Sequence, residues 1–181
     1  MSCLKVNNKT SLAEEALYLD DLIQDKTDLL QPTLNQVLEY SNQHIVDGLM
    51  LALDIDLETA KQLFEDGLTW LWYCNNNASE GYREIDDPIL ILDEVWHIFM
   101  LYTPYYTKFC ITYFGDYLHH MPTLLDSKES KHDNSQEIYL SRKKKQLETI
   151  YELAGREVFT RWYHQYPATF SREAILALRK K

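Results

Sequence analysis

Glycine and proline, the residues that make tight turns, are scarce in this chain. Five of each stand among 181 residues, about half of their usual combined share. A β-sandwich or β-barrel needs many tight turns, and a chain so poor in turn residues cannot supply them. No segment alternates apolar and polar residues between turn residues over the length of a strand. We therefore predict an all-α fold without a sheet.

The length of the chain suits one domain of ordinary size, with a core that needs neither metals nor disulfides. We expect a polar, frayed start over residues 1–9 and a single helical domain over residues 10–181. About six to eight helices should pack there as an orthogonal bundle, a number that follows from the spacing of caps and apolar residues. A segment rich in Ser, Lys, Asp and Asn predicts a polar loop at residues 126–135.

Capping residues and apolar spacing predict where the helices begin. The expected starts are Ser11, Pro32, Asp56, Asp87-Pro88, Thr103-Pro104, residue 136, residue 156 and Ser171. The helix from Pro32 is expected to run on through Ile45. Gly115 and Gly155 should end the two helices that precede them, and the helix over 156–165 should stop before Pro167.

Charge is unevenly spread along the chain, which carries a net charge of −10. Residues 1–90 hold a net −12 and residues 91–181 a net +2. An acidic first half repels phosphates and anionic lipids, so we expect neither a nucleic acid nor a membrane as partner. The basic run Arg142–Lys145 is interpreted as a solvated helix surface, with an anionic partner as the alternative. Opposite charges on the two parts of the chain favour a protein partner or self-association.

Three cysteines, Cys3, Cys74 and Cys110, form no C-x-x-C pair, and no signal peptide is apparent. The most apolar stretch, residues 89–101, contains charged residues and is too short to cross a bilayer. An odd number of unpaired cysteines suits a reducing compartment, so we expect a cytoplasmic protein.

The helix predicted over residues 88–101 carries the candidate site. At about 100° per residue, Asp93, Glu94 and His97 fall on one arc of this helix. Apolar residues occupy the same arc above and below them, so the three form a polar island in an apolar surface. Because an unpaired buried charge is costly, such an island needs partners. We expect His97 to be buried and partnered.

Two interpretations of this island stay open, and both recruit His119 and His120 from the turn after Gly115. In the first, these side chains form a buried hydrogen-bonded network at a helix junction of a protein-interaction module. In the second, Asp93, His97, His119 and His120 hold one divalent metal ion. If such a metalloprotein is an enzyme, Glu94 would be the general base beside a metal-bound water.

One observation limits the second interpretation to a mononuclear site. Glu94-x-x-His97 has the spacing of a di-iron bundle, but the chain contains no second motif of this kind. Cys110 is expected on a buried helix face, and it would add a thiolate to the metal only if its side chain faced the same way as those of the candidate ligands. No Gly-rich phosphate loop, GxSxG or HExxH motif is present, which removes the common nucleotide-binding, serine-hydrolase and zinc-protease classes.

Several unusual residues at fixed spacings also carry a family resemblance. They are Asp93-Glu94-Val95-Trp96-His97, Thr103, Tyr106, Cys110, Phe114-Gly115, His119-His120 and Pro122. This pattern resembles the glycine-rich domain-containing protein-like family, whose defining module is a domain of unknown function. The resemblance covers residues 85–122 well. It implies a helical domain but no established activity, so no catalytic role follows from it.

Overall fold

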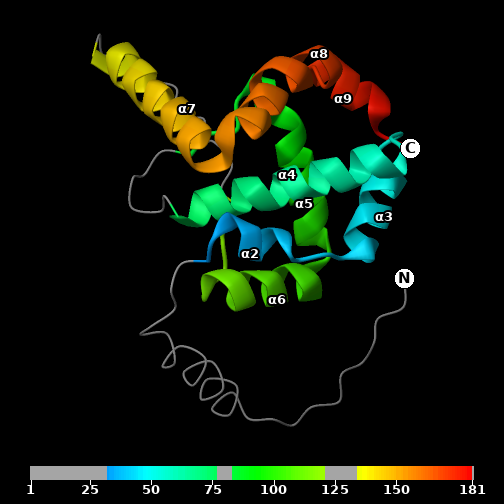
Figure 1. Cartoon of the computed structure of the whole chain (residues 1–181). Coiled ribbons are helices and arrows are strands. Elements are labelled where there is room, and N and C mark those ends of the chain that lie inside the picture. The colour runs from blue at the N-terminus through cyan, green and yellow to red at the C-terminus, as the bar shows by residue number, and fades with distance from the viewer. Residues whose placement is uncertain (1–31, 77–82, 121–133, 181) are drawn as a thin grey trace. The chain divides into compact units, whose positions relative to one another are not determined.

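The computed structural model of the protein describes residues 32–76, 83–120 and 134–180. The chain divides into two compact units, Met1–Leu30 and Gln31–Lys181, and every described residue belongs to the second (Figure 1). The expected frayed start and the helix from Ser11 lie outside the described residues, as does most of the loop predicted at 126–135.

The described ranges are built from helices, which confirms the predicted all-α class. In chain order they are α2 (Leu34–Leu38), α3 (Gln43–Ala52), α4 (Leu57–Asn76), the 3-10 turn η3 (Asp87–Ile89), α5 (Leu90–Leu101), α6 (Thr103–Phe114), α7 (Asn134–Thr160), the π-helical turn η5 (Arg161–Gln165), α8 (Tyr166–Thr169) and α9 (Arg172–Leu178). Strand-like pairing within these ranges amounts to an isolated antiparallel bridge between Leu53 and Arg179. None of the described helices combines the length and apolarity that spanning a membrane requires.

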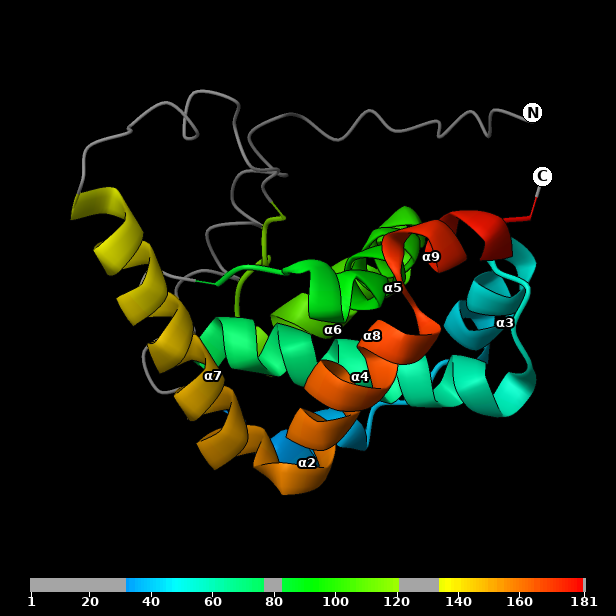
Figure 2. The ribbon, with the colours of Figure 1, turned by 90° about the horizontal axis from the view of Figure 1, so that it is seen from above.

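Helix α4 is the central element of the bundle. Asp56 caps it, because its carboxylate accepts a hydrogen bond of 2.7 Å from the N–H of Thr59, as predicted. Helices α2, α3, α5 and α7 all pack against α4, and Figure 2 shows the chain after α7 passing over it through α8. A Cβ atom at Gly67 would lie 2.6 Å from Val95 of α5. Glycine at this position therefore lets α4 and α5 approach closely.

The helix expected from Pro32 through Ile45 is in fact two helices. Thr33 caps α2, so Pro32 lies before the helix, and Asn42 caps α3 separately. Tyr40, in the turn between the two helices, places its ring against four aromatic rings from α4, α5 and α6. The turn between α2 and α3 thus lets the partly buried ring of Tyr40 pack against the core, and this packing outweighs continued helix formation.

Gly115 and Gly155 both break the helices that precede them, as predicted, but the C-terminal helices continue farther than expected. Gly115 ends α6 with φ 73°, a left-handed conformation that favours glycine. Gly155 interrupts α7 with φ 86°, and helix resumes at once on the far side. The chain then runs through η5 past Pro167, which lies in the first turn of α8. Proline is tolerated there because the first turn of a helix needs no N–H donor from it.

Candidate functional site

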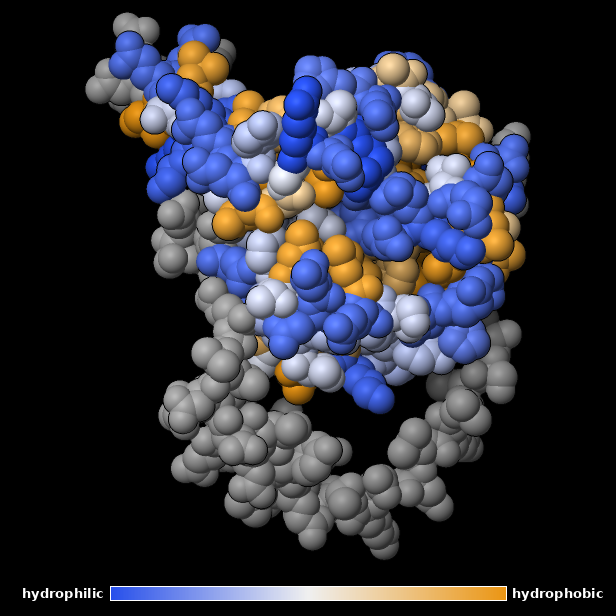
Figure 3. All heavy atoms as spheres, viewed as in Figure 1, coloured by the Kyte–Doolittle hydropathy of each residue, from blue (hydrophilic) through white to orange (hydrophobic). Residues whose placement is uncertain are grey.

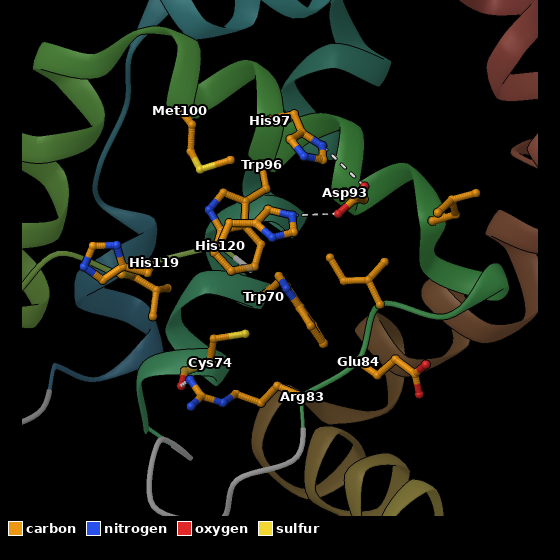
Figure 4. A pocket seen from close by; sticks show the side chains of 13 residues that line it. Trp70, Cys74, Arg83, Glu84, Asp93, Trp96, His97, Met100, His119 and His120 are labelled. Atoms are coloured by element: carbon orange, nitrogen blue, oxygen red, sulfur yellow. Dashed lines mark hydrogen bonds and ion pairs between the residues drawn. The ribbon is translucent and has the colours of Figure 1, made fainter. Parts of the chain in front are cut away.

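Three of the predicted metal ligands come together at the edge of the bundle. Asp93 and His97 lie one turn apart on α5, and His120 lies in the segment that follows α6 (Figure 4). Oδ1 of Asp93 is 2.8 Å from Nε2 of His120, and Oδ2 is 3.3 Å from Nδ1 of His97. One ligand atom from each residue can be chosen so that all three lie within 4.8 Å of one another. We refer to these residues as the Asp93–His97–His120 cluster.

His120 is held in this cluster by ring stacking and by buried hydrogen bonds next to it. Its ring centroid lies 4.3 Å from that of Trp96 and 4.7 Å from that of His97, with interplanar angles of 27° and 25°. The indole N–H of Trp96 donates to the Tyr106 hydroxyl at 2.9 Å, and that hydroxyl donates to the carbonyl of Leu118 at 2.6 Å. These bonds fasten the segment after α6 to α5 and α6, so the position of His120 depends on buried groups.

The prediction that His97 is buried was wrong. About half of its side-chain surface, 52%, is exposed, against 27% for Asp93 and 16% for His120. Asp93 and His97 face a cavity and solvent, because the segment after α6 covers only part of this side of α5. The cluster therefore lies where an ion or a small molecule reaches it.

Two other predicted site residues, His119 and Glu94, are not brought into the cluster. The ring of His119 packs against Tyr117, and Figure 4 shows it turned away from Asp93. The carboxylate of Glu94 accepts a hydrogen bond from Arg179 near the C-terminus and does not line the cavity. Glu94 therefore does not lie where a general base beside the cluster would have to be.

A cavity of about 630 Å³ adjoins the cluster. It is lined by Trp70, Cys74, Arg83, Glu84, Ile85, Leu90, Asp93, Trp96, His97, Met100, Leu118, His119 and His120. About half of these side chains are apolar or aromatic, and the other six are charged or imidazole groups. Small-molecule sites combine an apolar wall with polar groups that orient the ligand. The indole nitrogen of Trp70 is buried and has no hydrogen-bond partner among the described residues.

One wall of the cavity, residues 83–85, is positioned by α7. The buried amide of Gln146 accepts from the N–H of Glu84 and donates to its carbonyl, both at 2.9 Å. Arg83 donates to the carbonyl of Cys74 near the C-terminal end of α4. This wall was not predictable from the sequence, because Gln146 stands 62 positions from Glu84 and neither residue belongs to a motif.

The part of the chain that holds this site matches a known protein family. A family model described as UCP032817-like matches residues 54–148, just over half of the chain. The chain belongs to the UCP032817-like family. The matched range includes the whole Asp93–His97–His120 cluster and every residue that lines the cavity. The family model represents a domain of unknown function and so implies no activity. Neither the curated proteins nor the solved structures include a significant match to the chain.

The two described cysteines of this UCP032817-like protein are buried thiols. Burial raises the pKa of Cys74 to about 12, although the nearby charge of Arg83 acts in the opposite direction. Burial also raises the pKa of Cys110, which lies beside Tyr106, as expected for a buried helix face. Protonated thiols are poor metal ligands and poor nucleophiles. Neither cysteine belongs to the cluster of potential metal ligands.

A second group of charges lies away from the cavity, and it too was not predicted from the sequence. The buried carboxylate of Asp66 on α4 accepts two hydrogen bonds from Arg161, at 2.7 and 2.6 Å, and another from the Tyr166 hydroxyl. These bonds to Asp66 raise the pKa of Arg161, and burial raises that of Tyr166. Because the group joins α4 to η5 and α8 and lines no part of the cavity, we assign it a structural role.

Proposed function

We propose that the Asp93–His97–His120 cluster binds one divalent transition-metal ion at the edge of the cavity. The observation that carries this proposal is the convergence of two imidazoles and a carboxylate, from two different elements, to within 4.8 Å. Two histidines and one carboxylate are the ligand set of catalytic zinc sites and of non-haem iron(II) sites. Both kinds of site leave coordination positions open, and here those positions would face the cavity.

A small adjustment of the side chains would suit the cluster to a metal. Nitrogen and oxygen ligands at about 2.0–2.1 Å from a tetrahedral zinc ion lie roughly 3.3 Å from one another. Oδ1 of Asp93 lies 2.8 Å from His120 and Oδ2 lies 3.3 Å from His97, so each imidazole is already near one carboxylate oxygen. With a single oxygen as the ligand, the other imidazole must move closer to that oxygen, and the half-exposed ring of His97 has room to do so.

Zinc titration and elemental analysis of untagged protein test the proposal. We expect the parent to bind one zinc ion, and Asp93→Asn and His120→Ala to weaken binding by about tenfold or more. His119→Ala is the matched control, because His119 lines the same cavity but lies outside the cluster. A parent that binds no zinc, or a His119→Ala variant as defective as His120→Ala, would contradict this assignment.

A second candidate function, protein interaction, is supported by the N-terminal half of α7. Ile138 and Leu140 there are 49% and 57% exposed, with the exposed basic residues Arg142 and Lys144 next to them. Figure 3 shows this projecting end of α7 with hydrophobic and hydrophilic surface side by side. On a chain of net charge −10, such a surface suits a second copy of this chain better than a nucleic acid or a membrane.

We further propose a cytoplasmic location and kinship with the glycine-rich domain-containing proteins. The free, buried thiols of Cys74 and Cys110 support a reducing compartment. The residues of the Asp93–Pro122 motif that suggested the kinship all lie within the range matched by the family model.

A further inference from the structure

We infer that the cavity beside the cluster binds a small organic anion, a carboxylate attached to an aromatic or aliphatic body. This inference goes beyond metal binding, because it depends on Arg83 and on the apolar wall rather than on the cluster. The volume of about 630 Å³ falls inside the usual range for small-molecule sites, roughly 300–1,000 Å³.

The apolar body of the ligand would lie against side chains from both central helices. Trp70 comes from α4, and Trp96 and Met100 come from α5. Trp96 is fixed by its hydrogen bond to Tyr106, so this part of the wall is formed before a ligand arrives. Flat aromatic surfaces together with a flexible methionine accommodate aromatic and aliphatic groups alike.

The negative charge of the ligand follows from how the charged groups of the wall are arranged. Figure 4 shows the Arg83 guanidinium turned toward Cys74, on the side of the cavity opposite the cluster, and the Glu84 carboxylate turned the other way. Asp93 already interacts with both cluster histidines. Arginine presents a planar fork of N–H donors that matches a carboxylate. Arg83 is the one lysine or arginine among the described residues that line the cavity, so we place the negative group of the ligand beside it.

The position of Arg83 is set in advance by its neighbours. Its own hydrogen bond to the Cys74 carbonyl attaches it to the end of α4, and the Gln146 amide holds the adjacent residue Glu84 through two backbone bonds. A charge held in place before binding loses less conformational entropy when the ligand arrives. The loop thus presents Arg83 to the cavity as a preformed anchor for an anion.

Calorimetric titration of the full chain, stripped of metal with a chelating resin, tests this inference. The probes are naphthoate, its neutral amide naphthamide, and the aliphatic acid decanoate. We expect naphthoate and decanoate to bind with dissociation constants below about 1 mM, and naphthamide to bind about tenfold more weakly than naphthoate. Equal binding of naphthoate and naphthamide, or no binding of either acid at millimolar concentration, would overturn the inference.

Variants locate the site. Arg83→Met should weaken naphthoate binding by about tenfold without changing naphthamide binding, and Arg83→Lys should restore part of the loss. Arg172→Met is the matched control, because Arg172 pairs with Asp87 outside the cavity and its loss should leave binding unchanged. Met100→Trp fills the cavity and should weaken both acids even if Arg83→Met does not fold.

Unchanged naphthoate binding in folded Arg83→Met, or in Met100→Trp, would place the ligand elsewhere and overturn the inference. Because the protein carries no metal in these titrations, a failure of the zinc experiment and a failure of this one are distinguishable.

Discussion

Burial of Cys74 links its thiol chemistry to the stability of the protein. The thiol has a pKa of about 12 in the folded chain, against an ordinary value of 9.0. Between these pH values the unfolded chain ionises and the folded chain does not, so the free energy of unfolding falls as pH rises above about 9. We expect Cys74 to contribute about 1.4 kcal/mol to this fall by pH 10. Urea unfolding of the parent and of Cys74→Ala at pH 7 and pH 10 measures the contribution, since buried tyrosines affect both proteins equally. An identical pH dependence in the two proteins would show that the Cys74 thiol is not protected.

Helices α4, η5 and α8 are joined by the bonds of Asp66 to Arg161 and Tyr166. Asp66→Ala leaves the charge of Arg161 without its buried partner, and we expect the free energy of unfolding to fall by about 3 kcal/mol. Asp87→Ala removes an Asp–Arg pair of similar length whose side chains are both exposed, 81% and 63%, and should cost about 0–1 kcal/mol. Chemical denaturation of both variants makes the comparison. If the two losses are equal, the Asp66 group does not tie the C-terminal helices to α4.

Across the whole molecule, the charge distribution favours contact between copies of the chain. The chain as a whole carries a net charge of −10, whereas an exposed segment of α7 around Leu140 and Lys144 is basic and apolar. We expect self-association that weakens when salt shortens the Debye length below about 8 Å, and that Lys144→Glu or Leu140→Glu reduces. Sedimentation velocity at low and high salt measures it, with Lys61→Glu on α4 as the control for a change of charge elsewhere. A monomer under all conditions, or tight salt-sensitive binding to generic double-stranded DNA, would contradict this prediction.

Local interactions along the sequence were enough to determine the helical class and several helix ends. Asp56, Gly115 and Ser171 act within four residues of their own positions, so their capping roles were predictable without knowledge of the fold. The proximity of Asp93 and His97 is likewise a property of a single helix turn. The break between α2 and α3 was not predictable in this way, because the ring of Tyr40 finds its partners on three other helices.

Only the tertiary structure decided which distant groups meet. His120 rather than His119 reaches Asp93 across 27 positions, and Glu94 turns to Arg179 across 85. Asp93 and Glu94 are adjacent on one helix, yet they point about 100° apart and so face different neighbours. Sequence spacing places residues on a face of their own helix, but which segment covers that face depends on how the helices pack. For that reason the sequence did not determine which residues pair with Asp93, and it did not predict the cavity wall at Arg83.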